Sequence, residues 1–191
     1  MSTIFALSGA SGTGKTVTLE ALRQKDHWTN SVSVTRKVLE KMQLSLDQVS
    51  KNSELMHVFQ ENVKKDMSDR LQTLQNWNLG PVYIDRSHAD LYGYAAHWET
   101  TNTYTTDHRW LANYELDLVG HALLIRCAFI LPPGKFDHVD DGVRADAASQ
   151  QPVHDAIVKF YTKHNISYHI VQSITPEDRA DEIIEISKGY L

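Results

Sequence analysis

The stretch LSGASGTGKTVTLEAL, residues 7–22, decides the predicted fold. It opens on the end of a short apolar run, and glycines at positions 9, 12 and 14 then lead to Lys15 and Thr16. The spacing G-x-x-x-x-G-K-T fits the P-loop pattern, in which a glycine-rich turn joins a buried strand to a helix and turns backbone N–H groups toward a polyphosphate. The predicted phosphate-binding residues are Gly9, Ala10, Ser11, Gly12, Thr13, Gly14, Lys15 and Thr16.

The same loop predicts a nucleotide and a metal ion. In the P-loop pattern the lysine reaches the β and γ phosphates and the hydroxyl residue ligates magnesium, so Lys15 and Thr16 take these roles here. The alternative is a glycine-rich turn without a ligand, but the strand before it and the helix after it favour phosphate binding. We therefore expect ATP and Mg²⁺ as cofactors. The choice between ATP and GTP stays open.

Length and composition indicate an ordinary globular protein. The chain has 191 residues, of which 41% are hydrophobic and 23% charged, so we expect one domain over residues 1–191. With a net charge of -5, broad electrostatic binding to nucleic acid is not the default expectation. A local basic groove for DNA stays an alternative. Cys127, the single cysteine, lies in an apolar run and is expected to be a buried thiol.

The sequence gives no sign of a membrane protein. No apolar run approaches the roughly 20 residues that a membrane-spanning helix needs. The first predicted strand starts close to Met1, which leaves no room for a signal peptide. We expect a cytoplasmic location and no membrane partner.

Strands and helices alternate along the chain. Apolar runs predict strands at residues 3–9, 31–35, 81–85, 122–131 and 166–171, and helical spacing predicts helices at 15–25, 36–43, 54–77, 88–98, 107–119, 152–164 and 176–188. This order predicts an α/β fold, a P-loop three-layer sandwich with a mostly parallel five-stranded sheet flanked by helices. The polar segment after the fourth strand has no apolar face and predicts a lid loop over about residues 133–151.

The third predicted strand ends in two charged residues, Asp85 and Arg86. The carboxyl ends of parallel strands lie at one edge of a sheet, so both residues should lie near the P-loop. Asp85 would complete the magnesium shell or accept a proton from an attacking hydroxyl, and the sequence does not decide between these roles. The alternative is that Asp85 caps a helix beside a surface arginine.

Four features together resemble the P-loop nucleoside and nucleotide kinases: the P-loop, DRS at residues 85–87, Tyr94 beyond it, and DDGVR at residues 140–144. Thymidylate kinases carry Asp-Arg-aromatic with a tyrosine at similar spacing, and deoxynucleoside kinases carry an acid followed by Arg-Ser. Within this group the chain looks like the small kinase-like ATPases of the AAA type, related to the bacterial nicotinamide riboside kinase domain and often found in phages. The resemblance covers most of the chain, and only the P-loop is specific by itself.

The resemblance implies further site residues. By position, Arg36 matches the arginine after the second strand, Arg86 the one beside the acceptor, and Arg144 the one in the lid. Guanidinium groups can clamp the oxygens of a transferred phosphoryl group, so Lys15, Asp85, Arg86 and Arg144 are the implied catalytic residues. Arg36, Arg86 and Tyr94 are the implied substrate-binding residues. For Arg36, an exposed position on a helix is the alternative.

Two departures from the family pattern limit these inferences. Val34 and Thr35 stand before Arg36, where related kinases often have a glutamate, and this shifts the expected base to Asp85. Ser87 replaces the aromatic residue of thymidylate kinases, so their base pocket cannot be assumed here. Aromatic side chains between residues 92 and 114 could stack on an acceptor ring or could only pack the helices; they are Tyr92, Tyr94, Trp98, Tyr104, Trp110 and Tyr114.

We therefore expect an ATP-dependent phosphotransferase that moves the γ-phosphoryl group to a nucleoside, a nucleotide or a nucleoside-like acceptor. One alternative is a kinase of a hydroxymethyl-modified pyrimidine within DNA, as in phage DNA hypermodification, which the acidic net charge disfavours. A second alternative is a nucleotide-binding switch with little turnover, which the arginine-bearing lid disfavours. The identity of the acceptor and the oligomeric state stay open.

Overall fold

Five parallel strands form one sheet in the order β2-β3-β1-β4-β5. This computed structural model describes residues 1–101, 108–134 and 147–191. The strands are β1 (Thr3–Ser8), β2 (Trp28–Asn30), β3 (Pro81–Asp85), β4 (Cys127–Ile130) and β5 (Tyr168–Ile170). In the register of the sheet, Leu7 of β1 lies beside Asp85 of β3 and Phe129 of β4. The predicted α/β sandwich with a parallel sheet is confirmed.

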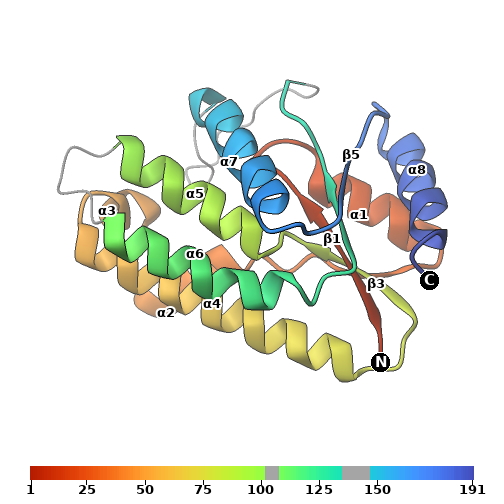
Figure 1. Ribbon diagram of the computed structural model, residues 1–191, viewed down its shortest axis with the longest axis horizontal. Helices are drawn as coiled ribbons and strands as arrows, with labels where there is room; N and C mark the ends of the chain where they lie inside the picture. Colours follow the sequence, from red (N-terminus) through yellow and green to blue (C-terminus); the bar gives the residue numbers. More distant parts are fainter. Residues whose placement is uncertain (102–107, 135–146) are drawn as a thin grey trace.

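Helices cover both faces of the sheet (Figure 1). They are α1 (Lys15–Gln24), α2 (Val34–Met42), α3 (Leu46–Ser50), α4 (Ser53–Asn76), α5 (His88–Thr101), α6 (His108–Ala122), α7 (Gln150–Lys163) and α8 (Pro176–Lys188), with a short 3-10 helix at Ala147–Ser149. Successive side chains of a strand point to opposite faces. Phe5 and Leu7 therefore join the core under α1 and α8, while Ile4 and Ala6 pack with Leu71 of α4.

The second strand differs from its prediction. It lies at Trp28–Asn30, so the strand predicted at residues 31–35 is wrong, and α2 already begins at Val34. Val34 is buried in the core as a helical residue, whereas Val32 is exposed before the helix, so the alternation of valines at 32 and 34 did not mark a strand. Arg70 of α4 holds the connection, because it donates to Asn30 Oδ1 at 3.3 Å and to the carbonyl of Val32 at 2.8 Å.

Two other boundaries also differ. The fourth strand, predicted from residue 122, begins only at Cys127, because α6 continues to Ala122 and Leu123 and Leu124 lie exposed after it. Of the predicted lid at residues 133–151, residues 147–151 form a 3-10 turn and the start of α7, and the remainder from 135 on lies outside the described residues. Cys127 is fully buried as predicted, and burial raises the pKa of its thiol.

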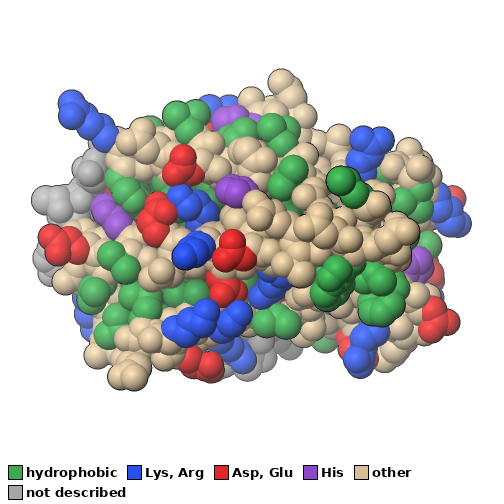
Figure 2. Space-filling model, turned by 90° about the horizontal axis from the view of Figure 1, so that it is seen from below, with side chains coloured by type: hydrophobic (Ala, Val, Ile, Leu, Met, Phe, Trp, Pro, Cys, Tyr) green, Lys and Arg blue, Asp and Glu red, His purple; other side chains and the backbone are tan. Residues whose placement is uncertain are grey.

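Charges of opposite sign lie side by side on the α4 side of the molecule (Figure 2). Lys64 contacts Glu61 at 2.6 Å and Asp117 at 3.0 Å. On the neighbouring α2, Lys37 and Lys41 each lie 3.2 Å from Asp66. These lysines are therefore partly neutralised by carboxylates, so this face gives no uniformly basic surface.

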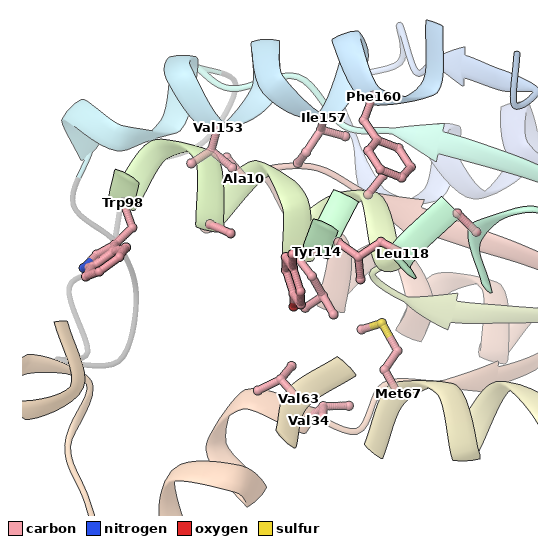
Figure 3. Close-up of a cluster of buried hydrophobic side chains, with 14 of the residues drawn as sticks. Ala10, Val34, Val63, Met67, Trp98, Tyr114, Leu118, Val153, Ile157 and Phe160 are labelled. Atoms are coloured by element: carbon pink, nitrogen blue, oxygen red, sulfur yellow. The ribbon is translucent and has the colours of Figure 1, made fainter. Parts of the chain in front are cut away.

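The largest core cluster fixes the position of α5 (Figure 3). Val153, Ile157 and Phe160 of α7 point toward α5 from above in this view. Gly93 makes the close approach of the two helices possible, since a Cβ at this position would lie 2.6 Å from Ile157 Cγ1. This close packing against α7 in turn fixes the start of α5, where the candidate site lies.

Candidate active site

The turn at residues 9–14 joins β1 to α1 and has the backbone of a phosphate-binding loop. Gly9, Gly12 and Gly14 have φ angles of +134°, +77° and +87°, which L-residues with a side chain rarely adopt. At Gly9 a Cβ would also lie 2.6 Å from the carbonyl oxygen of Leu131. The turn delivers the chain directly to the N-terminus of α1, where the positive end of the helix dipole lies.

Lys15 lies folded over this turn. Its side chain is buried, and Nζ donates to the carbonyls of Gly9 at 2.7 Å and Ala10 at 2.6 Å, and to Thr13 Oγ1 at 3.3 Å. Thr16 is exposed on the first turn of α1. The ammonium group of Lys15 therefore lies against the loop, and Thr16 is the second residue of the helix that follows the loop.

Several loop carbonyls are held from outside the loop. Gln150 of α7 donates to the carbonyl of Ser11 at 2.9 Å, and Arg179 of α8 donates to the carbonyl of Thr13 at 3.0 Å. In a planar trans peptide the C=O and the following N–H point in opposite directions. The amides of Gly12 and Gly14 follow these two carbonyls, and they make no hydrogen bond within the described ranges. These amides are available to an anion.

Asp85 and Arg86 lie at the same edge of the sheet as the loop. Asp85 is half-buried, and its Oδ1 atom is buried with no hydrogen-bond partner among the residues described. Arg86 has a φ of +67°, unusual for a residue with a side chain. Its amide donates to the carbonyl of Leu7 at 2.9 Å, and its guanidinium donates to the carbonyl of Gly9 and to the Tyr94 hydroxyl, each at 3.4 Å.

Asp90 is a site residue that sequence reasoning missed. It is fully buried and accepts hydrogen bonds from Ser8 Oγ at 2.5 Å, the Gly9 amide at 2.9 Å and the Ser87 amide at 2.8 Å. Its Oδ1 atom also lies 3.6 Å from Arg86 Nη1. One carboxylate thus joins the start of the P-loop to the start of α5. The sequence carried a signal for it, since Ser87-His88-Ala89-Asp90 fits the capping-box pattern.

Ser87, and not Asp85, caps α5. Ser87 Oγ accepts from the amide of Ala89 at 3.0 Å, and the amide of Asp90 donates to the Ser87 carbonyl at 3.1 Å. The capping alternative for Asp85 is therefore wrong. Tyr161 of α7 extends the polar cluster, because its buried hydroxyl lies 2.5 Å from Ser87 Oγ and donates to Ser8 Oγ at 3.1 Å. No sequence signal pointed to Tyr161.

The surroundings of Arg86 keep it charged. Burial alone would lower the pKa of its guanidinium, but Tyr94, Asp90 and Asp85 together raise that pKa above its ordinary value. The guanidinium also lies over the Tyr94 ring, 5.0 Å from its centre. A permanent positive charge is thus fixed beside Gly9.

A family model described as AAA domain matches residues 4–179. The chain belongs to this AAA-domain family. No curated protein matches the sequence.

Solved structures similar to this AAA-domain protein include a nucleotide kinase and a nucleoside kinase. The NadR protein in complex with NR has a TM-score of 0.74 at 13% identity, over 99% of this chain and 50% of that one, so the chain spans about half the length of NadR. Thymidylate kinase from Candida albicans has a TM-score of 0.69 at 14% identity, over 98% and 92% of the two chains. Deoxyadenosine kinase from M. mycoides with bound dATP has a TM-score of 0.69 at 12% identity, over 97% and 99%. These likenesses show a nucleoside and nucleotide kinase fold.

Other predicted residues of the AAA-domain protein lie elsewhere or outside the described part. Arg36 is exposed in the first turn of α2, inside the helix and not directly after the strand. Arg144 lies outside the described residues. Trp98 donates from Nε1 to the carbonyl of Ser50 at 3.0 Å, and Trp110 stacks between His57 and Tyr114. These two tryptophans pack helices, whereas Tyr94 reaches the site.

Within the described ranges, no group of three or more His, Cys, Asp or Glu side chains could hold a metal ion by itself. None of the described helices has the length and apolar character needed to cross a membrane. A magnesium ion at the P-loop would therefore need ligands from a nucleotide and from water in addition to protein oxygens.

Proposed function

We propose that this AAA-domain protein is an ATP-dependent phosphotransferase that moves the γ-phosphoryl group to a hydroxyl or phosphate of a nucleoside, nucleotide or nucleoside-like acceptor. The observation that carries the proposal is the fixed guanidinium of Arg86 beside Gly9. A cation at this place can neutralise a phosphoryl group that leaves the P-loop, which is the main catalytic demand of phosphoryl transfer. The kinase fold of its structural neighbours supports the same reading.

The loop supplies the donor site. The amides of Gly12 and Gly14 and the N-terminus of α1 bind the phosphates, and Lys15 neutralises their charge. Lys15 Nζ now rests on the carbonyls of Gly9 and Ala10. It exchanges these carbonyls for phosphate oxygens when the nucleotide binds.

The residues at the sheet edge fit a magnesium ion. Asp85 has a buried carboxylate oxygen without a hydrogen-bond partner in the described part of the chain, and carboxylate and hydroxyl oxygens suit this cation. Asp85 and Thr16 would hold it. Bound magnesium supplies charge neutralisation at the β and γ phosphates. Asp85 is alternatively the base that accepts the proton of an acceptor hydroxyl.

The acceptor lies on the α5 side of the loop in this proposal. Arg86 and Tyr94 contact each other there, so an acceptor held by Tyr94 would present its reacting oxygen to the phosphoryl group clamped by Arg86. Arg36 and Arg144 are proposed as further contacts to the acceptor and to the phosphoryl group.

The test is transfer of labelled γ-phosphate from ATP to a panel of acceptors: free nucleosides, nucleotides, and DNA that contains a hydroxymethyl pyrimidine. Lys15→Ala should abolish transfer and keep the fold. Lys25→Ala is the matched control at the C-terminal end of the same helix, because Lys25 pairs with Asp181 at 2.8 Å. Full activity of Lys15→Ala would remove the P-loop from the reaction. Label in DNA alone would favour the modified-DNA alternative.

A further inference from the structure

Arg179 of α8 is a fully buried arginine directly behind the P-loop. None of its surface is exposed. Its Nη1 atom donates to the carbonyl of Thr13 at 3.0 Å, and its Nε atom donates to the carbonyl of Ser173 at 3.0 Å. Burying a guanidinium is costly unless it makes good hydrogen bonds, and these bonds join the loop to the turn before α8.

The contact with Thr13 decides which way one loop amide points. Thr13 and Gly14 share a planar peptide unit, so a carbonyl that is held toward α8 turns the Gly14 N–H away from α8. Gly14 has a φ of +87° and stands directly before Lys15, the first residue of α1. Without a side chain at Gly14, this peptide unit could flip at little steric cost.

We propose that Arg179 is a positioning residue for the donor phosphates: it fixes the Thr13–Gly14 peptide so that the Gly14 amide points into the phosphate site before the nucleotide binds. The inference rests on the proposed function. It deepens that function, because the lysine and glycines of the motif leave the orientation of this peptide unit unexplained. An amide that is already oriented costs no reorganisation on binding.

The contacts of Arg179 also allow a second role, which predicts a different result for phosphate binding. Through Ser173, Arg179 also holds the turn after β5, whose amides at Gln172 and Ser173 donate to Glu182 at distances of 2.8–3.2 Å. If Arg179 acted only by holding that turn, the Gly14 amide would keep its orientation, and the affinity for phosphates alone would not depend on Arg179. Inorganic tripolyphosphate has no nucleoside part, so it separates the two readings.

The experiment measures by calorimetry the affinity of magnesium tripolyphosphate and of magnesium ATP for wild type and Arg179→Met. We expect the affinity for both probes to fall in parallel by roughly 10- to 100-fold, the range for loss of one hydrogen bond to a charged group. Arg126→Met is the matched control, because Arg126 also holds a backbone carbonyl, that of Tyr190 at 3.2 Å, but it stands directly before β4, at the edge of the sheet opposite the P-loop. It should leave both affinities unchanged.

The outcomes separate cleanly. A folded Arg179→Met that keeps wild-type affinity for tripolyphosphate overturns the proposal, and so does a loss confined to ATP. Arg179→Lys keeps the buried charge and provides the same comparison where Arg179→Met does not fold. This variant has a single ammonium group in place of the guanidinium, and it should still bind both probes more weakly than wild type. A wild-type protein that binds neither probe contradicts the proposed function itself.

Discussion

The carboxylate of Asp90 accepts a hydrogen bond from the backbone amide of Gly9 at 2.9 Å, although the two residues lie 81 positions apart. The same carboxylate holds Ser8, Ser87 and, at 3.6 Å, Arg86. The first residue of the P-loop and the arginine proposed for phosphoryl transfer are therefore fixed by one side chain. Rigid support of this kind is what a preorganised site requires.

Replacement of Asp90 by Asn should weaken both stability and catalysis. The amide side chain offers one acceptor and two donors where the structure needs an acceptor for every contact, so a buried polar group is left unsatisfied. We expect a loss of about 1–3 kcal/mol in the free energy of unfolding and a lower kcat, measured by urea denaturation and by a transfer assay. Asp181→Asn, at an exposed ion pair with Lys25, should change neither; an unaltered Asp90→Asn would contradict the role of Asp90.

Replacement of Arg86 by Lys should lower kcat on the order of 10³-fold, the scale of a transition-state arginine. Lysine keeps the charge but cannot donate in two directions at once to Gly9 and Tyr94. Stability should change less than activity. Arg23→Lys, at an exposed pair with Glu20 at 2.8 Å, is the control. A kcat within twofold of wild type would exclude Arg86 from the transfer step.

Arg86 should not contribute a limb to the pH profile of kcat. Its pKa is raised above the ordinary arginine value by Tyr94, Asp90 and Asp85, which outweigh the effect of burial. A raised pKa means that the charge is present at every pH below it, so the contribution of Arg86 is constant from pH 6 to about 10. An alkaline limb in the wild-type profile below pH 10 that is absent in Arg86→Gln, whose side chain has no proton to lose in this range, would be inconsistent with this reading.

Glu182 should make the protein sensitive to acid. Burial would raise the pKa of this carboxyl, but hydrogen bonds from Gln172, Ser173 and His169 lower it to about 2. The stabilisation is present above the unfolded value of about 4.5 and is lost as pH falls toward 2. Glu182→Gln should therefore be less stable at neutral pH and should flatten the pH dependence of unfolding between pH 4.5 and 2. An unchanged slope in that window would refute the assignment.

Gly9→Ala and Gly120→Ala should behave in opposite ways. A Cβ at Gly9 would lie 2.6 Å from the carbonyl oxygen of Leu131 at a φ of +134°, whereas nothing lies within 4 Å of a Cβ at Gly120 in α6. We expect Gly9→Ala to cost about 1–3 kcal/mol and to weaken nucleotide binding. Gly120→Ala should stabilise the protein by up to about 1 kcal/mol. Thermal unfolding and calorimetric ATP titration test both, and an equal effect of the two changes would contradict the fold at Gly9.

The parts of the site that the sequence predicted are those fixed by local pattern and by the geometry of parallel sheets. The P-loop needs only one strand, one turn and one helix. The placement of Asp85 and Arg86 followed from the rule that strand ends meet at one edge, and the register of Leu7 with Asp85 places them there. The interpretation of their chemical roles stays a prediction.

The parts that could not be predicted depend on contacts between distant segments. Arg179 lies 166 positions from Thr13, and Tyr161 lies 153 positions from Ser8, and no local pattern records such pairs. The position of β2 was predicted wrongly for another reason. Its three residues are exposed or half-buried, so they form no buried apolar run that would indicate a strand. The alternating valines at positions 32 and 34 formed the stronger pattern, although Val34 begins α2 and Val32 lies directly before that helix.

The most direct test of the account is the rate of γ-phosphate loss from ATP by the wild-type protein, measured with and without the best nucleoside or nucleotide acceptor of the panel. We predict that turnover depends on the acceptor and that the label is recovered on the acceptor. Lys15→Ala and Arg86→Lys should both lose this acceptor-dependent turnover. Slow hydrolysis at one rate, with or without any acceptor and with the label only in inorganic phosphate, would contradict a phosphotransferase and indicate a nucleotide-dependent switch.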